Sequence, residues 1–388
     1  MKVVAALDSF KGSLSSREAG EAAAAGVRAA VPGAEVVVVG VADGGEGLVD
    51  ALLVVEGGRE VVVDAVDPFG RPLHAGHAVL ADGTIVIEAA RTVGLDLVGP
   101  VDTTVPLRAS SYGLGLQLAA ALASDAPRVL VGLGGSATTD GGTGLLSALG
   151  ARLETTGPAG HGNLLPSVVG VGTLPDLSRV EVLTDVTSPL LGPTGAARLF
   201  GPQKGADPDQ VVLLETAMAG WAQLLAAAAG RPVAEVVHAP GSGAAGGLGA
   251  ALVACGARLV PGFARVAALV GLADVLVGAD LVLTGEGSFD AQSALGKGPV
   301  GVADLARAHG VPVVVLAGRV EHPLGAVGDR VDAAFGIHPV PLPFAEALDP
   351  ANARAGLRHT AGEVARFAAR LATHDEPQAD GVVRPLTG

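Results

Sequence analysis

Short apolar and β-branched runs alternate along the chain with longer segments of helical periodicity. Residues Lys2–Leu7 predict a buried strand, and Ser15-Ser16-Arg17-Glu18 is a capping box that predicts a helix reaching about Ala30. Pro32-Gly33 ends this helix, and residues 35–41 predict the next strand. Such a strand–helix–strand pattern is typical of a parallel sheet with helices on its faces.

A similar pattern returns near the C-terminus, with strands predicted at 281–284 and 312–317 and helices at 300–309 and 351–373. Neither end of the chain has enough strands for a stable sheet. We therefore predict that both ends form one α/β domain, residues 1–69 plus 285–373.

The middle of the chain, residues 70–284, predicts a second α/β domain inserted into the first. It has elements of its own, namely strands at 85–89, 128–132 and 180–183 and helices at 112–123 and 245–254. Residues 374–388 are rich in Asp, Glu, Pro and Gly and predict a loose tail. A chain of 388 residues also exceeds the usual size of one hydrophobic core.

The formal net charge of −14 argues against nucleic acid or an anionic membrane as a partner. An anionic substrate would need a local basic cluster. The single cysteine, Cys255, excludes an intrachain disulfide and a zinc ribbon. The sequence predicts no signal peptide and no stretch approaching the roughly 20 apolar residues of a membrane span, so a cytoplasmic protein is expected.

Lysine is scarce, and its positions suggest phosphate binding. The four lysines are Lys2, Lys11, Lys204 and Lys297, and the last three each precede a glycine. A lysine meets a phosphate as a compact point charge, which the planar fork of arginine does not reproduce. Glycine lets the backbone approach a ligand closely.

Five loops that follow predicted strands combine small residues with an acid or a hydroxyl. They are Asp8 to Ser13, Asp43 to Gly47, Gly132 to Gly142, Thr184 to Val186 and Gly285 to Asp290. Phosphoryl transfer needs such groups, because backbone N–H groups and lysine hold phosphate, carboxylates hold magnesium, and an acid orients the acceptor hydroxyl. Each loop also has a simpler interpretation: an Asp-Gly pair as a tight turn, or Asp185 as a helix cap.

Two other functions fit parts of the chain. Gly132-x-Gly134-x-x-Ala137 after a strand fits a dinucleotide-binding fingerprint, and Glu154 follows at the distance of a ribose-binding acid, which would indicate an NAD-dependent oxidoreductase. Against it, Gly141 and Gly142 fall where the helix should run and would cost about 2 kcal/mol there. A non-catalytic binding module would leave the many carboxylates unexplained.

The loops together strongly resemble the glycerate kinase family, over about residues 1 to 372. The matching stretches are Asp8-Ser9-Phe10-Lys11-Gly12-Ser13-Leu14-Ser15, Val41-Ala42-Asp43-Gly44-Gly45-Glu46-Gly47, Gly134-Gly135-Ser136-Ala137-Thr138, Asp140-Gly141-Gly142, Asp185-Val186, Phe200-Gly201-Pro202-Gln203-Lys204-Gly205-Ala206, Gly243-Ala244-Ala245-Gly246-Gly247, Thr284-Gly285-Glu286-Gly287 and Gly296-Lys297. The resemblance implies ATP and Mg²⁺ as cofactors, D-glycerate as substrate and 2-phosphoglycerate as product. It also implies a flavodoxin-like, that is Rossmann-like, parallel-sheet domain made from both chain ends.

On this basis we expect Asp185 to bind Mg²⁺, and Asp43 or Asp290 to accept the hydroxyl proton. Lys11 and Lys204 are expected to hold phosphate or the glycerate carboxylate, and backbone N–H groups of the Gly134–Gly135–Ser136 loop to hold ATP phosphate. The other expected binding residues are Ser9, Glu286 and Lys297. The expected partners are small molecules, glycerate and ATP, with no nucleic acid or membrane, and the protein is expected to be a monomer or homodimer.

The chain departs from the family pattern at a few positions, of which Ser288 matters most, because arginine is usual there. Either a nearby arginine such as Arg319 supplies the charge, or the enzyme is a kinase of a related small hydroxy acid.

Overall fold

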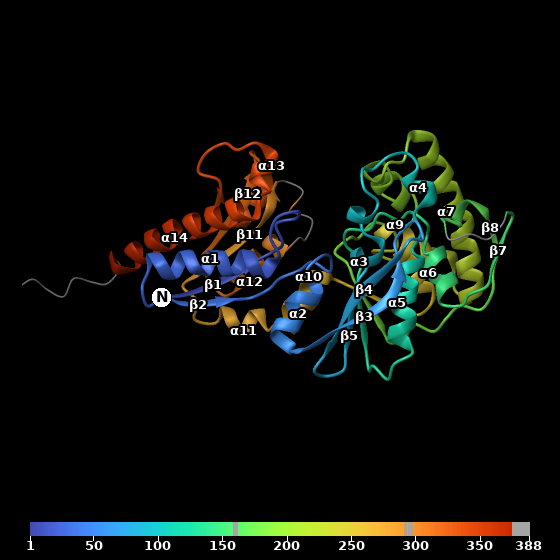
Figure 1. The fold of residues 1–388 in the computed structure, drawn as a ribbon, viewed down its shortest axis with the longest axis horizontal. Coiled ribbons are helices and arrows are strands. Elements are labelled where there is room, and N and C mark those ends of the chain that lie inside the picture. Colours follow the sequence, from blue (N-terminus) through green and yellow to red (C-terminus); the bar gives the residue numbers. More distant parts are fainter. Residues whose placement is uncertain (158–161, 291–292, 294–297, 375–388) are drawn as a thin grey trace, which may run out of the picture. The chain divides into compact units, whose positions relative to one another are not determined.

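The structure, a computed structural model, describes residues 1–157, 162–290, 293 and 298–374. The chain divides into two compact units. Unit 1 consists of Met1–Val39, Ala273–Gln292 and Val302–Gly388, and unit 2 of Gly40–Leu272 and Ser293–Gly301. In Figure 1, unit 1 therefore combines the dark blue start of the chain with its orange and red end.

Unit 1 contains a five-stranded parallel sheet in the order β13-β12-β11-β1-β2. Its strands are β1 (Lys2–Leu7), β2 (Glu35–Val38), β11 (Leu281–Phe289), β12 (Val313–Val320) and β13 (Ala333–Gly336). The helices that lie wholly or mostly in this unit are α1 (Ser16–Ala30), α11 (Leu272–Leu276), α12 (Gly298–Ala308), α13 (Phe344–Ala347) and α14 (Pro350–His374). Counted within the unit, the strand order is 2-1-3-4-5, as in flavodoxin. The expected α/β class is confirmed.

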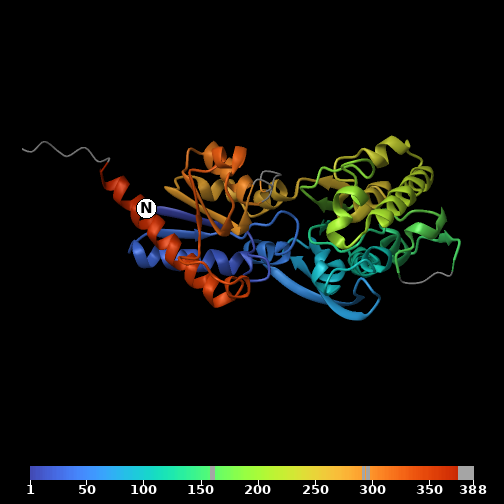
Figure 2. The ribbon, with the colours of Figure 1, turned by 90° about the horizontal axis from the view of Figure 1, so that it is seen from above.

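Helix α1 begins where the capping box predicted. The Ser15 side chain accepts the Glu18 N–H, and the Glu18 carboxylate accepts the Ser15 N–H. Its small buried residues pack against the sheet and against α14, which lies beside it in Figures 1 and 2. A side chain at Gly26 would collide with the backbone of Arg358 on α14, so this glycine permits the close packing of the two helices.

Unit 2 contains a six-stranded mixed sheet in the order β10-β9-β6-β5-β4-β3. Strands β5, β6, β9 and β10 are parallel, whereas β4 is antiparallel to both β3 and β5. The strands of the sheet are β3 (Gly58–Val66), β4 (Pro72–Leu80), β5 (Ile85–Glu88), β6 (Val129–Gly132), β9 (Val180–Leu183) and β10 (Arg258–Val260). A separate antiparallel pair consists of β7 (Leu153–Thr155) and β8 (Val168–Val171).

The helices of unit 2 cover this sheet and enclose its core. They are α2 (Leu48–Glu56), α3 (Ala90–Val93), α4 (Val105–Arg108), α5 (Tyr112–Leu122), α6 (Thr143–Ala148), α7 (Pro208–Ala229), α8 (Val233–Val237), α9 (Ala244–Ala254) and α10 (Gly262–Leu269).

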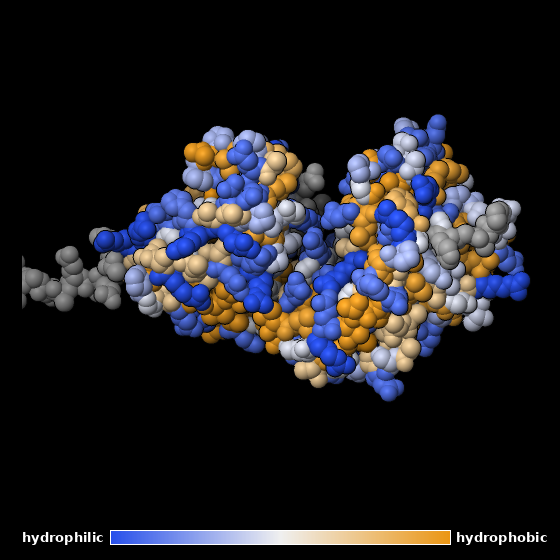
Figure 3. Space-filling view, in the orientation of Figure 1, coloured by the Kyte–Doolittle hydropathy of each residue, from blue (hydrophilic) through white to orange (hydrophobic). Residues whose placement is uncertain are grey.

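Helix α7 corrects one prediction, because the sequence was expected to hold no apolar stretch of membrane-spanning length. Among the described residues, α7 is the one helix whose length and composition would allow it to cross a membrane. Its Leu214, Met218, Trp221 and Leu225 recur every three or four residues and are buried in the unit 2 core, as in an ordinary core helix. On the face drawn in Figure 3, apolar and polar residues are interspersed.

The compact units do not begin and end at the predicted domain boundaries. Residues 40–69 were assigned to the first domain, yet β3 pairs along its whole length with β4 of unit 2. Residues 281–284 were assigned to the inserted domain, yet they form part of β11 and pair with β1. Strand pairing between distant residues therefore decides both boundaries. Most of the predicted tail, 375–388, lies outside the described residues.

Candidate functional site

In unit 2, three of the predicted loops lie together at the carboxyl ends of β6 and β9. The Gly134 N–H donates to the Gly44 carbonyl over 3.3 Å. Gly134 also lies so close to Gly45 that a side chain at position 134 would collide with the Gly45 backbone. A Cβ at Gly44 would lie 2.8 Å from the Leu183 carbonyl oxygen at the end of β9. The glycines are therefore needed for the Asp43 loop to pack directly on the Gly132–Ser136 loop.

Two carboxylates, Asp43 and Asp185, meet in this cluster. Burial raises the pKa of Asp185 to about 6, and the nearby Asp43 charge adds to the rise. Asp185 Oδ2 accepts the Phe263 N–H over 3.0 Å, at the start of α10, and Asp43 Oδ1 accepts the Gly45 N–H over 2.9 Å. Asp185 therefore does cap a helix, as the simpler interpretation held, and also lies beside a second acid.

Lys204 is buried behind the glycine loop. Its side chain is 3% exposed, and Nζ donates to Ser136 Oγ over 3.1 Å and to the Thr138 carbonyl over 2.8 Å. Burial lowers the pKa of Lys204 to about 7, although the Asp140 charge opposes the shift. Lys204 thus supports the loop that contains Ser136.

Asp140 fixes the far end of the same loop. Its carboxylate accepts the N–H and the hydroxyl of Ser111, each over 2.8 Å, and the N–H groups of Gly142 and Gly144, each over 3.1 Å. Burial raises the pKa of Asp140. Among the described residues, the hydroxyls of Thr138 and Thr139 are buried without a hydrogen-bond partner. The loop is therefore held from both ends and retains polar groups that a ligand could use.

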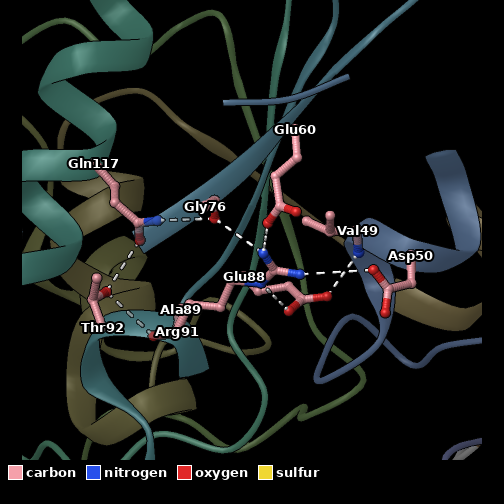
Figure 4. A network of polar contacts seen from close by, with 9 residues as sticks. All are labelled: Val49, Asp50, Glu60, Gly76, Glu88, Ala89, Arg91, Thr92 and Gln117. Carbon is pink, nitrogen blue, oxygen red and sulfur yellow. Dashed lines mark hydrogen bonds and ion pairs between the residues drawn. The ribbon is translucent and has the colours of Figure 1, made fainter. Parts of the chain in front are cut away.

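A polar network that sequence reasoning missed anchors the helix after the Asp43 loop (Figure 4). Helix α2 lacks a side-chain cap of its own, and the Glu88 carboxylate accepts the Val49 N–H over 2.7 Å. Glu88 is 4% exposed, and burial raises its pKa. Arg91 donates to Glu88 over 2.8 Å and also pairs with Glu60 and Asp50. In the sequence, the spacing of three residues between Glu88 and Arg91 was the signal from which this ion pair could have been predicted.

In unit 1, the predicted residues gather at the carboxyl ends of β1 and β11. Ser9 is buried, and its N–H donates to Asp8 over 2.6 Å, while Lys11 is exposed. The Phe10–Leu14 bridge closes the turn that carries Lys11. Leu7 pairs with Gly285, so Glu286 follows directly on the neighbouring strand, and Asp290 comes just after that strand. Lys297 lies outside the described residues.

Strand β11 is longer than predicted, and this brings Ser288 beside Arg319. The sequence indicated a loop from Gly285 to Asp290, but β11 continues to Phe289 because it pairs with β12 over that length. Ser288 and Arg319 are register partners in this pairing. The arginine that could replace the usual family residue is therefore its direct neighbour.

The geometry does not support the dinucleotide-binding fingerprint. In that motif the glycine loop opens directly into a helix. Here β6 ends at Gly132, and α6 begins only at Thr143. Glu154 lies on β7, which pairs with β8 outside the main sheet. The NAD-dependent interpretation is therefore corrected.

Comparison with known proteins settles the family. The model of the "Glycerate kinase family" matches residues 3–369. This chain belongs to the glycerate kinase family. A glycerate kinase of Bacillus subtilis is 39% identical over 376 residues, which cover 94% of this chain and 97% of the relative. The glycerate 2-kinase of Escherichia coli is 40% identical over 348 residues, with coverages of 87% and 90%.

A solved structure confirms the fold of this family member. A crystal structure assigned provisionally as glycerate kinase 2 of Salmonella typhimurium LT2 matches with a TM-score of 0.78 and 38% identity, and the match covers 96% of this chain and 99% of that one.

The unit 2 carboxylates fit the magnesium ion that such a family implies. Within the described part of the chain, no group of three or more His, Cys, Asp and Glu side chains is placed to hold a metal. Magnesium in kinases needs only one or two carboxylates, together with phosphate oxygens and water. Asp43 and Asp185 supply that number. Burial and the Asp43 charge disfavour the ionised form of Asp185, and a bound cation would offset both effects.

Proposed function

We propose that this protein transfers the γ-phosphoryl group of ATP to the 2-hydroxyl of D-glycerate, and releases ADP and 2-phosphoglycerate. The observation that carries this proposal is the unit 2 cluster of a glycerate kinase family member, in which two acids lie beside a glycine loop supported by a buried lysine. These are the groups that phosphoryl transfer requires.

In the proposed reaction, the 2-hydroxyl oxygen bonds to the γ-phosphorus, and the bond from that phosphorus to the β,γ-bridging oxygen breaks. The hydroxyl proton passes to a carboxylate, for which Asp43 and Asp290 are the candidates. Asp185 would bind Mg²⁺, with Asp43 close by, and the ion would neutralise charge on the phosphate oxygens.

The remaining groups hold the reactants. We assign phosphate binding to the N–H groups of Gly134, Gly135 and Ser136, and Lys204 acts through its bond to Ser136. Lys11 supplies an exposed ammonium in unit 1. The other proposed contacts to substrate or phosphate come from Ser9, Glu286 and Lys297.

A coupled assay of ADP release with D-glycerate, L-glycerate and related hydroxy acids tests the proposal. We expect D-glycerate to give the highest kcat/KM, and phosphorus NMR of the product to show 2-phosphoglycerate. ADP release that does not depend on D-glycerate, or formation of the 3-phosphate, would contradict it.

Ser288 favours one alternative, a kinase of a related small hydroxy acid, and a substitution distinguishes the two. Arg319 could already supply the positive charge of the arginine that is usual in the family at position 288. In that case Ser288→Arg places two guanidinium groups side by side, and KM for D-glycerate stays similar or rises. Arg319→Ala should then raise KM. A tenfold fall in KM for Ser288→Arg, about 1.4 kcal/mol, would instead indicate a different acceptor.

We also propose that the enzyme is cytoplasmic, is a monomer or homodimer, and acts on small molecules without a nucleic acid or membrane partner. The net charge of −14 argues against nucleic acid and an anionic membrane surface as partners, and the packing of α7 in the unit 2 core argues against a membrane span.

A further inference from the structure

Unit 1 contains a cavity of about 610 Å³ at the carboxyl edge of its parallel sheet. Its polar side consists of the turn after β1 and the ends of β11 and β12, which contribute Lys11, Ser13, Ser288 and Arg319. Its other side consists of residues 337–348, an irregular segment followed by α13.

The cavity lies where an α/β sheet of this order binds its ligand. The chain leaves β1 toward β2 on one side, and leaves the adjacent β11 toward β12 on the other. Crossovers in opposite directions place their helices on opposite faces of the sheet, which opens a crevice between the two central strands. Phe10, Lys11 and Gly287, which line the cavity, follow or end these two strands.

Residues 337–348 give the cavity an apolar wall that is open to solvent. Val340 is 57% exposed and Phe344 is 79% exposed. Prolines at 339, 341 and 343 fix the backbone between them and hold these side chains outward without much loss of conformational entropy. A ligand with a flat apolar part would cover this wall, whereas glycerate, a three-carbon acid, has no such part.

The opposite wall suits an anion. Lys11 is exposed, and Arg319 pairs only with the exposed Glu321 among the ion pairs of the described residues, an arrangement of small energetic value. Ser13 Oγ is buried and has no hydrogen-bond partner among the described residues. A ligand that satisfies both walls has an apolar ring at one end and negative charge at the other.

We propose that this cavity binds the phosphoryl donor, with the adenine and ribose of ATP against Val340 and Phe344 and its phosphates toward Lys11 and Ser13. This inference rests on the proposed function and adds the place of the nucleotide. The volume of the cavity falls within the range of roughly 300 to 1,000 Å³ that is usual for small-molecule sites.

The test uses the full-length protein with Phe344→Ala and Val340→Asp, whose native side chains are exposed. Phe367→Ala and Val277→Asp are matched controls, because Phe367 is 67% exposed and Val277 is 63% exposed, and neither lines the cavity. We expect both cavity variants to raise KM for ATP, and Kd for the non-hydrolysable analogue AMP-PNP, about tenfold. KM for D-glycerate should stay within twofold, and the controls should match the wild type.

Inorganic tripolyphosphate separates the ring from the phosphates. Because it lacks a base, its inhibition constant should be the same for wild type and Phe344→Ala, whereas Lys11→Ala should raise it.

If the wild type phosphorylates D-glycerate but both cavity variants keep the wild-type Kd for AMP-PNP, the nucleotide lies elsewhere and only this inference fails. An increased KM for D-glycerate alone would make the cavity the acceptor site and also overturn it. If the wild type lacks kinase activity, the proposed function fails, and AMP-PNP binding still decides whether the cavity takes a nucleotide.

Discussion

Lys204 shows how one side chain can support a loop from inside the protein. Both of its hydrogen-bond partners, Ser136 and Thr138, belong to the glycine loop, and almost none of its surface is exposed. A guanidinium is larger and planar, so it cannot place one donor between these two oxygens without displacing the loop. The preference for lysine at this position therefore has a steric cause as well as an electrostatic one.

We predict that Lys204→Arg and Lys11→Arg each lower kcat about a hundredfold, or about 3 kcal/mol in transition-state stabilisation. Lys204→Arg should also lower the free energy of unfolding, because its site is buried, whereas Lys11→Arg should not. Steady-state kinetics and urea unfolding would measure both effects. Lys2→Arg, at a lysine that bonds the Val277 carbonyl away from the site, is the control and should behave as wild type. Near-normal kinetics in both site variants would refute the prediction.

Asp185 is predicted to serve the reaction at a cost to stability. Asp185→Asn keeps an oxygen that can accept the Phe263 N–H, so we expect a folded protein that has lost its magnesium-dependent activity. A magnesium titration of the reaction rate would test this expectation. Unchanged activity and an unchanged titration curve would contradict it.

The raised pKa of Asp185 also gives a stability prediction with a definite sign. The folded protein holds this proton more tightly than the unfolded chain. The contribution of Asp185 to the free energy of unfolding therefore falls as pH rises from 3.8 to about 6, and is level above that. Without magnesium, Asp185→Asn should therefore match or exceed wild-type stability at pH 8, by up to about 1 to 2 kcal/mol. Urea unfolding in EDTA at pH 4 and pH 8 measures this difference, and a variant less stable than wild type at pH 8 would reject it.

At the scale of elements, the Glu88–Arg91 network joins four elements of unit 2. Glu88 ends β5, Arg91 lies on α3, and their partners lie on α2 and β3. Helix α2 starts directly after the Asp43 loop, so its first turn fixes one end of that loop. The network thereby helps to hold the loop that contains Asp43.

We predict that Arg91→Ala lowers the free energy of unfolding by about 2 to 4 kcal/mol, because Glu88 stays buried without its partner. The pKa of Glu88 is already raised by burial and should rise further. Its ionised form is then less favourable, so the loss should be larger at pH 8 than at pH 5. Arg366→Ala, which breaks an exposed pair with Glu363, is the control and should cost under about 0.5 kcal/mol. An equal loss at both pH values would contradict this account.

Local signals predicted individual elements better than their connections. The capping box placed the start of α1, and the buried runs placed β1, β5, β6 and β9 within a residue or two. The glycines of 285–287 suggested a loop, but pairing with β12 keeps that stretch in a strand. The candidate acids were predicted from loops that follow strands, and their roles stay predictions. The burial of Lys204 and the open apolar wall at 337–348 were not predicted, because both depend on residues distant in the sequence.

At the scale of the whole molecule, each unit has its own core, yet the chain connects them as an insertion. If unit 2 unfolded alone, unit 1 would have to close a loop of more than 200 residues. That closure would cost about 5 kcal/mol, which is comparable to the stability of a whole domain. Unfolding of unit 2 while unit 1 stays folded is therefore unfavourable.

We accordingly predict one cooperative unfolding transition. Trp221, the single tryptophan, is buried in unit 2 and reports that unit by fluorescence, whereas far-UV circular dichroism reports both. The two urea midpoints should coincide, and calorimetric and van't Hoff enthalpies should agree. A dichroism change that persists after the fluorescence change is complete would show that the units unfold separately.

The pairing of β1 with β11 has a consequence for synthesis on the ribosome. Val3 in β1 pairs with Leu281, so the first strand to be made cannot find this neighbour until the ribosome has added β11. At about 5 to 20 residues per second, this delay is roughly 15 to 55 s. During that time unit 2 can fold, while β1 has only β2 as a neighbour and its other edge stays unpaired. The N-terminus of this enzyme is therefore where a chaperone would be needed first.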